Sequence, residues 1–505
     1  MDDTLMSRTE TRRKAALATL DSTTQAKLGQ FFTPERAAEL IATFPRLPKS
    51  GRLRVLDPGA GAGSLAAALV SRVLEESPHL TLEIVAVELD PGVHPYLAET
   101  LADCERYGQA QGTSVSTVLV KGDYIDLSDG GVDSDAALTE PFDIVVMNPP
   151  YAKLAASSPQ RKALISQGVD CPNLYAAFLA LGTAALGAGG QLVAITPRSF
   201  ANGPYFAQFR KYLLRNVAVD RLHTFESRST VFADTGVLQE NIILSATREG
   251  VRDKVRLTAS NGHTDEGTEH VVDYTDLVHP NDPHQFLRIA SGDEATEVAE
   301  QMASQPDTTA TLGIQVSTGK VVDFRSRENL REAVEENCVP LIYPGNVRGG
   351  VIEWPREIRK PQGFALTGPA SEKLLLPSGC YVVVKRFSAK EERRRIVAGI
   401  WDPATNGETP VAFENHLNIV HKGGQGLDRP LAIGLSLWLN STLVDKFFRM
   451  FSGHTQVNAT DLRSLRFPDL DTLRALGTNV PASLPDQEEV DALVEKHVRG
   501  SEAVA

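Results

Sequence analysis

Short hydrophobic runs in the first half of the chain alternate with longer segments whose apolar positions have helical spacing. The clearest strand-like runs are RLRVLDPG, LEIVAVELD, STVLVKGD and FDIVVMNPP, which end at residues 59, 90, 123 and 150. Strands that take turns with helices are typical of a parallel sheet covered on both faces. This pattern predicts an α/β domain.

Further runs extend this domain toward residue 248. Segments 190–196, 216–225 and 237–247 predict three more strands. The apolar stretch 174–195 contains four glycines, so it predicts a helix followed by a strand rather than a membrane span. We therefore expect the first domain to occupy residues 1–248.

The second half of the sequence has a different texture. Residues 249–310 are polar and acidic with little periodicity, which predicts a connector or small subdomain. Residues 311–505 mix short strands such as YVVVKRF (381–387) with Pro/Gly turns, and residues 486–498 have an amphipathic helical pattern. We expect this third region to be a mixed α+β domain.

Composition and charge narrow the function. The four cysteines are too far apart for a zinc cluster or a disulfide framework, and the N-terminus has no apolar signal-peptide core, so we expect a cytoplasmic protein without a membrane partner. A net charge of −13 argues against nucleic acid as a partner. Residues 341–400, however, carry 11 Lys or Arg against 5 Asp or Glu, which allows a local basic face.

A glycine loop and two acidic residues follow the first three predicted strands. Gly59, Gly61 and Gly63 allow a tight turn with its backbone close to a ligand, although a plain strand-to-helix turn would need the same residues. Glu88 ends the next strand, where a carboxylate can accept hydrogen bonds from ribose hydroxyls. Asp123 ends the third and could accept from an adenine amino group or merely cap a loop. Together these residues predict a nucleotide-cofactor site.

The fourth predicted strand ends in Asn148-Pro149-Pro150-Tyr151. The two prolines stiffen the backbone, so the carbonyl of Pro149 and the amide oxygen of Asn148 can point at one place. Two aimed acceptors suit a planar NH2 group, because accepting both hydrogens returns lone-pair density to the nitrogen as it attacks an electrophile. Tyr151 would stack on the ring that carries this amine. The alternative is a polyproline turn with a half-buried tyrosine.

These motifs resemble those of a known enzyme family. Asn-Pro-Pro-Tyr after a Gly-rich first turn resembles the S-adenosylmethionine-dependent amino methyltransferases. Leu28-Gly29-Gln30-Phe31-Phe32-Thr33-Pro34 is similar to the N-terminal cofactor motif of the gamma-class N6-adenine DNA methyltransferases of restriction–modification systems. The order of motifs also matches that class. The resemblance implies a Rossmann-like methyltransferase sheet followed by a target-recognition domain.

The resemblance also implies roles for individual residues. Phe31, Thr33 and Pro34 would contact the methionine portion of S-adenosylmethionine, and Asp57 with Gly59, Gly61 and Gly63 would form the floor beneath it. The remaining cofactor contacts would come from Glu88 on the ribose, Leu89 against the adenine, Asp123 on its amino group, and Asn148. The target adenine would meet Asn148, Pro149, Pro150 and Tyr151.

A duplex adenine must be flipped out to reach such a site, so a second stacking face is expected. Phe232 lies where the family often supplies an aromatic, although a core phenylalanine would fit the same pattern. The sulfonium methyl is already activated and no metal-binding motif is present in the sequence, so neither a general base nor a metal is expected.

The basic stretch of the third region suggests DNA contacts. Arg348, Lys385 and Arg386 are the preferred phosphate contacts. Lys390, Arg393, Arg394 and Arg395 are further candidates, but they could equally form a solvated helical face. Segments 413–418 and 452–462 look like elements of the family's target-recognition domain, although Thr460 could simply start a helix.

The sequence therefore predicts a site-specific DNA adenine methyltransferase that acts on double-stranded DNA in a type II restriction–modification system. Only 28 residues precede Gly29, so any endonuclease is expected on a separate chain. Two alternative enzymes use the same acceptors: an RNA amino methyltransferase and a protein glutamine methyltransferase, whose relatives are shorter and lack so large a second domain. A DNA-binding subunit without turnover is a third alternative.

Overall fold

The computed structural model divides the chain into two compact units, Met1–Gly292 and Asp293–Ala505. The structure describes residues 4–19, 32–128, 135–166, 168–201, 204–225, 241–260, 267–280, 282, 285–289, 293–333, 337–388, 392–451, 456–478, 480 and 485–500. The predicted contacts Phe31, Phe232 and Lys390 lie outside these residues. No described helix is long and apolar enough to cross a membrane.

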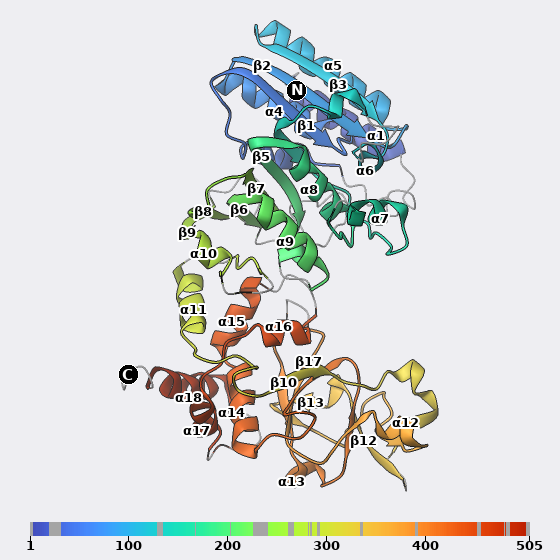
Figure 1. Ribbon diagram of the computed structural model, residues 1–505, viewed down its shortest axis with the longest axis vertical. Helices are drawn as coiled ribbons and strands as arrows, with labels where there is room; N and C mark the ends of the chain where they lie inside the picture. Colours follow the sequence, from blue (N-terminus) through green and yellow to red (C-terminus); the bar gives the residue numbers. More distant parts are fainter. Residues whose placement is uncertain are drawn as a thin grey trace. The chain divides into compact units, whose positions relative to one another are not determined.

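The first unit is built on one sheet (Figure 1), in which the described residues form nine strands in the order β3-β2-β1-β4-β5-β7-β6-β8-β9. The strands are β1 (Ser50–Pro58), β2 (His79–Glu88), β3 (Ser114–Lys121), β4 (Phe142–Met147), β5 (Leu186–Pro197), β6 (Val217–Phe225), β7 (Asn241–Arg248), β8 (Lys254–Ser260) and β9 (Thr268–Asp273). Strands β3, β2, β1, β4 and β5 are parallel, and β7 runs antiparallel to both β5 and β6. The predicted strands of residues 52–247 are confirmed where the structure describes them; residues 237–240 of the last predicted strand lie outside the described part.

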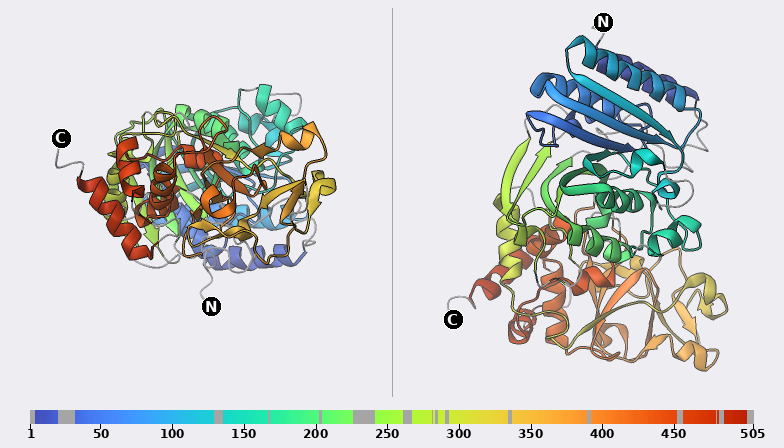
Figure 2. Two further views of the ribbon diagram at one scale, coloured as in Figure 1. Left: turned by 90° about the horizontal axis from the view of Figure 1, so that it is seen from below. Right: turned by 45° about the horizontal axis from the view of Figure 1, so that its top comes forward.

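Helices cover both faces of this sheet, as the sequence predicts (Figure 2). Successive strand residues point to opposite faces of the sheet and pack into two separate cores. Leu56, Val145 and Met147 belong to one core, whereas Val55 and Ile144 belong to the other. The helices of this unit are α1 (Leu5–Thr19), α3 (Glu35–Ala42), α4 (Ser64–Glu76), α5 (His94–Ala110), α6 (Tyr124–Leu127), α7 (Pro159–Ser166), α8 (Leu174–Ala185), α9 (Ala207–Asn216) and α10 (Tyr274–Leu277). The cores contain residues of α1, α3, α4 and α5 on one face and of α6, α8 and α9 on the other.

The structure divides the chain later than the sequence suggests. β8 and β9 lie beyond the expected boundary at residue 248, yet β8 pairs in parallel with β6 and β9 completes the sheet edge. Val255 and Leu257 of β8 are buried in the same core as β6. Residues 249–292 therefore belong to the sheet unit rather than to a connector. The polar sequence around these strands gives no local sign of this pairing, because the pairing is with a strand distant in the chain.

The second unit is a mixed α+β domain, as expected. Its strands form a sheet ordered β10-β20-β17-β18-β14-β13 and a second ordered β11-β15-β12-β19-β16. Side chains from both sheets share one core that includes Tyr381, Trp401 and Phe413. The strands are β10 (Gln315–Thr318), β11 (Leu330–Arg331), β12 (Cys338–Ile342), β13 (Val347–Arg348), β14 (Val351–Ile352), β15 (Gly363–Ala365), β16 (Leu375–Leu376), β17 (Tyr381–Lys385), β18 (Ala398–Trp401), β19 (Val411–Phe413) and β20 (Leu417–His421).

Helices of the second unit lie mainly after these strands in the chain. They are α11 (Asp293–Ala303), α12 (Pro369–Glu372), α13 (Pro403–Asn406), α14 (Arg429–Leu439), α15 (Thr442–Phe451), α16 (Ala459–Arg463), α17 (Leu470–Gly477) and α18 (Gln487–Gly500). The amphipathic helix predicted over 486–498 is confirmed as α18.

Candidate active site

The turn between β1 and α4 requires glycine for two reasons. Gly59, Gly61 and Gly63 all have positive φ, at 75°, 56° and 88°, which favours glycine. A Cβ atom on Gly61 would also lie 2.9 Å from Cδ1 of Phe32. The backbone N–H groups of Gly59 and Ala60 both donate to the carbonyl oxygen of Val87, at 2.8 and 2.9 Å. The loop is therefore fixed against the end of β2.

Glu88, at the end of β2, is held by the backbone around it. Its Oε2 accepts from the N–H of Gly61 at 2.9 Å, and its Oε1 accepts from the N–H of Asp90 at 2.8 Å. Each carboxylate oxygen has two lone pairs, so the group can still accept from a ligand hydroxyl. The side chain is only 5% exposed, and burial raises the pKa of Glu88.

Asp57 is more deeply buried than Glu88 and less well satisfied. The side chain is fully buried, and within the described residues neither carboxylate oxygen has a hydrogen-bond partner. Burial, and then the charge of Glu88, raise the pKa of Asp57 from 3.8 to about 8. Asp57 is not among the residues that line the pocket at this edge of the sheet.

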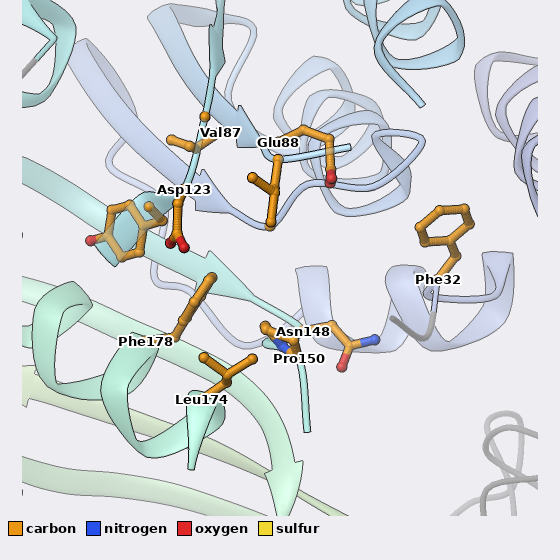
Figure 3. A pocket seen from close by; sticks show the side chains of 12 residues that line it. Phe32, Val87, Glu88, Asp123, Asn148, Pro150, Leu174 and Phe178 are labelled. Carbon is orange, nitrogen blue, oxygen red and sulfur yellow. The ribbon is translucent and has the colours of Figure 1, made fainter. Parts of the chain in front are cut away.

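A pocket at the carboxyl ends of the strands gathers much of the predicted site (Figure 3). The predicted residues that line it are Gly59, Glu88, Leu89, Asp123, Asn148 and Pro150. Six lining residues were not singled out from the sequence: Phe32, Val87, Gly122, Tyr124, Leu174 and Phe178. Phe32 and Tyr124 adjoin predicted motifs, but nothing in the pattern of α8 distinguishes Phe178 from a core residue.

The pocket has an apolar wall beside a carboxylate. Leu89 is 46% exposed and presents an apolar side chain to the pocket. The ring centroids of Tyr124 and Phe178 lie 5.3 Å apart. Asp123 accepts from the N–H of Ile125 at 2.9 Å, so it caps α6 while it also lines the pocket, and burial raises its pKa. The capping alternative and the site assignment are thus compatible.

The carboxamide of Asn148, directly after β4, is bound on both sides. Its Nδ2 donates to Oγ1 of Thr33 at 3.1 Å, and its Oδ1 accepts from the hydroxyl of Tyr151 at 3.1 Å. The ring of Tyr151 packs edge-on against Tyr175, with centroids 6.3 Å apart. Burial and then Tyr175 raise the pKa of Tyr151, which keeps this donor protonated.

Several other predicted site residues are neighbours in sequence of pocket residues but do not line the pocket themselves. Thr33 and Pro34 immediately precede α3, and Pro149 is buried between Asn148 and Pro150. Within the described residues, no cluster of three or more His, Cys, Asp or Glu side chains could hold a metal ion.

The basic candidates of the second unit differ in accessibility. Arg348 is exposed on β13, and Lys385 is half-buried, so that burial lowers its pKa. Arg386 donates through Nη1 to the carbonyl oxygen of Asn415 at 3.3 Å. Of these residues, Arg348 is the most available to a phosphate.

Two arginines of the basic run are structural. Arg395 is fully buried and donates to Oγ of Ser388 at 3.2 Å. Arg394 donates to the carbonyl oxygen of Ser441 at 3.1 Å. Packing therefore encloses Arg395, and the interpretation of that residue as a phosphate contact is wrong. Arg394 is only partly buried, so a phosphate contact by Arg394 stays a prediction. Neither residue lies in a helix, so the interpretation of the two as a helical face is wrong. Arg393 is exposed.

The two target-recognition segments are only partly accessible. Asn418 is fully buried and donates to the carbonyl oxygen of Val457 at 2.7 Å. Asn458 rather than Thr460 precedes α16, and its N–H donates to Asp461 at 2.8 Å. His416 remains half-exposed beside Phe387, with ring centroids 5.1 Å apart. Residues 452–455 lie outside the described part.

Comparisons with known proteins agree with these observations. Residues 121–232 match the family described as Eco57I restriction-modification methylase. The chain is 40% identical to type II methyltransferase M.BsuBI of Bacillus subtilis, over 94% of both chains. It is 38% identical to type II methyltransferase M.PstI of Providencia stuartii, over 96% of both.

A solved structure resembles the whole chain at low identity. The type IIL restriction-modification enzyme MmeI in complex with DNA matches with a TM-score of 0.59 and 11% identity, over 98% of this chain and 79% of that one. That similarity shows the fold. The family resemblance read from the motifs is confirmed by the full-length relatives: the chain belongs to the gamma-class N6-adenine type II methyltransferases of restriction–modification systems.

Proposed function

We propose that this chain binds S-adenosylmethionine in the pocket at the carboxyl ends of β1 to β4 and methylates N6 of an adenine flipped out of double-stranded DNA. The observation that carries the proposal is the carboxamide of Asn148, fixed by two hydrogen bonds at the rim of a pocket that also contains Glu88 and Asp123. Family membership supports the reaction class.

The pocket residues fit an adenosine group. The carboxylate of Glu88 can accept from ribose hydroxyls, and Asp123 can accept from an exocyclic amine. Leu89 and Phe178 offer apolar surface to an adenine ring. Thr33, Pro34, Asp57, Gly61 and Gly63 would shape the rest of the site, and Phe31 would join them. S-adenosylmethionine would supply a methyl group already activated on a sulfonium sulfur.

The chain's own residues would align the target amine. Oδ1 of Asn148 is an amide acceptor, so it would accept one hydrogen of an adenine NH2 while the carbonyl of Pro149 accepts the other. Accepting both hydrogens strengthens the nitrogen lone pair, and the surplus proton can leave after transfer. Pro150 stiffens this corner, and the ring of Tyr151 would face the flipped base, with Phe232 as a second stacking surface.

The second unit would recognise the DNA. Arg348, Lys385 and Arg386 are the proposed phosphate contacts, of which Arg348 is exposed. We place the enzyme in the cytoplasm with host DNA, and we assign cleavage in the restriction–modification system to a separately encoded endonuclease.

Methyl transfer to DNA by the purified chain tests this proposal. Tritiated S-adenosylmethionine and unmethylated genomic DNA should yield N6-methyladenine at one sequence, which modification-sensitive sequencing of an expressing host would identify. Asn148→Ala should abolish transfer while calorimetry still shows cofactor binding. Failure of the wild-type chain to methylate DNA, or unchanged turnover of Asn148→Ala, would refute the corresponding assignment. RNA and a glutamine peptide serve as competing substrates.

A further inference from the structure

The chain after β5 leaves the sheet at the same edge as Asn148. Strands β4 and β5 are parallel, and Met147 at the end of β4 pairs with Ala194 of β5. Asn148 directly follows Met147, so both strands release the chain at the carboxyl edge of the sheet. Two short 3-10 turns come next, η2 (Arg198–Ala201) and η3 (Pro204–Phe206), and they precede α9 (Figure 1). These turns therefore begin at the edge that carries the proposed site of transfer.

The turn η3 presents a large aromatic ring to solvent. Tyr205 is 79% exposed, and within the described residues it has no hydrogen bond, ion pair or ring contact. An exposed aromatic side chain gains free energy when a partner covers it, because apolar surface then leaves water. Single exposed apolar residues are common on proteins, so the surroundings of this residue decide how it is interpreted.

The residue next to Tyr205 belongs to a series of aromatic rings that reaches the Asn-Pro-Pro-Tyr motif. Phe206 is 9% exposed and stacks on Tyr175 of α8, with ring centroids 5.5 Å apart and an angle of 25° between the planes. Tyr175 packs edge-on against Tyr151, with centroids 6.3 Å apart. Two ring contacts thus connect the neighbour of Tyr205 to the residue that would face the flipped base.

The chain before Tyr205 is also anchored by buried groups. Phe200 of η2 is fully buried, and its carbonyl oxygen accepts from Nη1 of Arg210 at 2.9 Å. The carbonyl oxygen of Ala201 accepts from the N–H of Leu287 at 3.0 Å. A side chain on a support that is already held in place loses less conformational freedom when it binds a partner. Tyr205 therefore combines an uncovered ring with anchored neighbours.

A duplex from which one base has been extruded offers a matching surface. Flipping unstacks the target base, so the faces of its neighbours are left without a stacking partner. An aromatic ring stacks on any base, because every base has a π face, and side chains inserted at a base step stabilise a distorted duplex. The hydroxyl of a tyrosine can remain in water while its ring is covered.

We propose that Tyr205 enters the duplex beside the flipped adenine and stacks on the bases that stay behind, which stabilises the extruded state. The proposal rests on the proposed function, because it assumes an adenine that leaves double-stranded DNA. Its role differs from the roles proposed for Tyr151 and Phe232, which would face the flipped base itself.

Tyr205→Ala removes the ring, and the duplex that contains the sequence methylated in the host is the probe. Single-turnover methylation at saturating enzyme and cofactor should slow about 5- to 100-fold, as expected when one aromatic stack on a base is lost. The dissociation constant of S-adenosylmethionine, measured by calorimetry, should stay within about twofold, because Tyr205 does not line the pocket. Tyr205→Phe keeps the ring and should stay within about threefold of the wild-type rate.

A second duplex, with an abasic site opposite the target adenine, isolates the flipping step. Removal of the partner base removes the pairing that opposes extrusion. The rates of wild type and Tyr205→Ala on this duplex should therefore differ by less than about twofold. A side chain that only contacts the outer surface of DNA would instead leave the same defect on both duplexes.

The controls keep the outcomes distinct. Val251 is 83% exposed but follows β7, which runs antiparallel to β5 and ends at the opposite edge of the sheet, so Val251→Ala should match wild type on both duplexes. Thermal unfolding checks each variant, and Tyr205→Ser replaces alanine if alanine lowers stability. A wild-type rate for Tyr205→Ala, an equal defect on both duplexes, or a Tyr205→Phe rate as slow as that of alanine would each overturn the insertion role. Wild-type protein that methylates no DNA would refute the proposed function itself.

Discussion

The most quantitative prediction concerns Asp57, whose side chain is fully buried and lacks a hydrogen-bond partner within the described residues. Its pKa rises from 3.8 in an ordinary setting to about 8 in the folded protein, chiefly because burial disfavours the charged form. Between these two values the folded protein keeps a proton that the unfolded chain releases. The contribution of Asp57 to the free energy of unfolding should therefore be highest below pH 4 and should fall as pH rises to about 8.

The size of the effect follows from the same interval. Each pKa unit corresponds to about 1.4 kcal/mol, so full ionisation of Asp57 would cost about 6 kcal/mol of stability, as an order of magnitude. Asp57→Asn removes the ionisation and keeps nearly the same shape. A buried amide has its own cost, but that cost does not depend on pH.

Urea unfolding at pH 5, 7 and 9 measures this effect. The stability of wild type relative to Asp57→Asn should decrease by several kcal/mol between the first and last of these values. Asp103→Asn is the contrasting variant: burial opposes ionisation of Asp103, but hydrogen bonds from Arg12 and Arg106 outweigh it and lower its pKa. The contribution of the Asp103 carboxylate to the free energy of unfolding should be lost only as pH falls. Parallel pH profiles for wild type and Asp57→Asn would refute the reasoning.

Two further predictions concern binding. Glu88→Ala should weaken S-adenosylmethionine binding about 10- to 100-fold in calorimetry, because it removes a charged acceptor and the hydrogen bond from the N–H of Gly61. Glu75→Ala on the exposed face of α4 is the control. Equal affinities of wild type and Glu88→Ala would contradict the ribose assignment. Arg348→Gln with Lys385→Gln should lower DNA affinity and reduce the slope of log affinity against log salt by about one for each lost phosphate contact, compared with Lys49→Gln before β1. An unaltered slope would move the phosphate surface elsewhere.

Local pattern was sufficient for the parallel half of the sheet and for the pocket rim. Each of the strands that end at Pro58, Glu88, Lys121 and Met147 is a short apolar run followed by polar or turn residues. Because parallel strands align their carboxyl ends, the residues after them had to meet at one edge. This reasoning brought Gly59, Glu88, Asp123 and Asn148 together without knowledge of any contact.

Contacts between distant segments could not be read in this way. β8 joins the sheet through β6, and the segment between them in the chain includes the antiparallel strand β7. The burial of Arg395 likewise depends on a distant segment, because its backbone N–H donates to Oδ1 of Asp445, 50 positions further along the chain, at 2.6 Å. A charged run looks the same in sequence whether packing encloses it or leaves it in water.

The sequence by itself determined the α/β class, the family and the edge of the sheet where the chemistry lies, because strand periodicity, glycine at strained turns and Asn-Pro-Pro-Tyr are local requirements. Only the tertiary structure decided that Asp57 is buried without a hydrogen-bond partner among the described residues, that Phe178 lines the pocket, and that Thr33 meets Asn148 across 115 positions of the chain. Burial and hydrogen-bond geometry arise from packing, and packing joins residues that no local pattern connects.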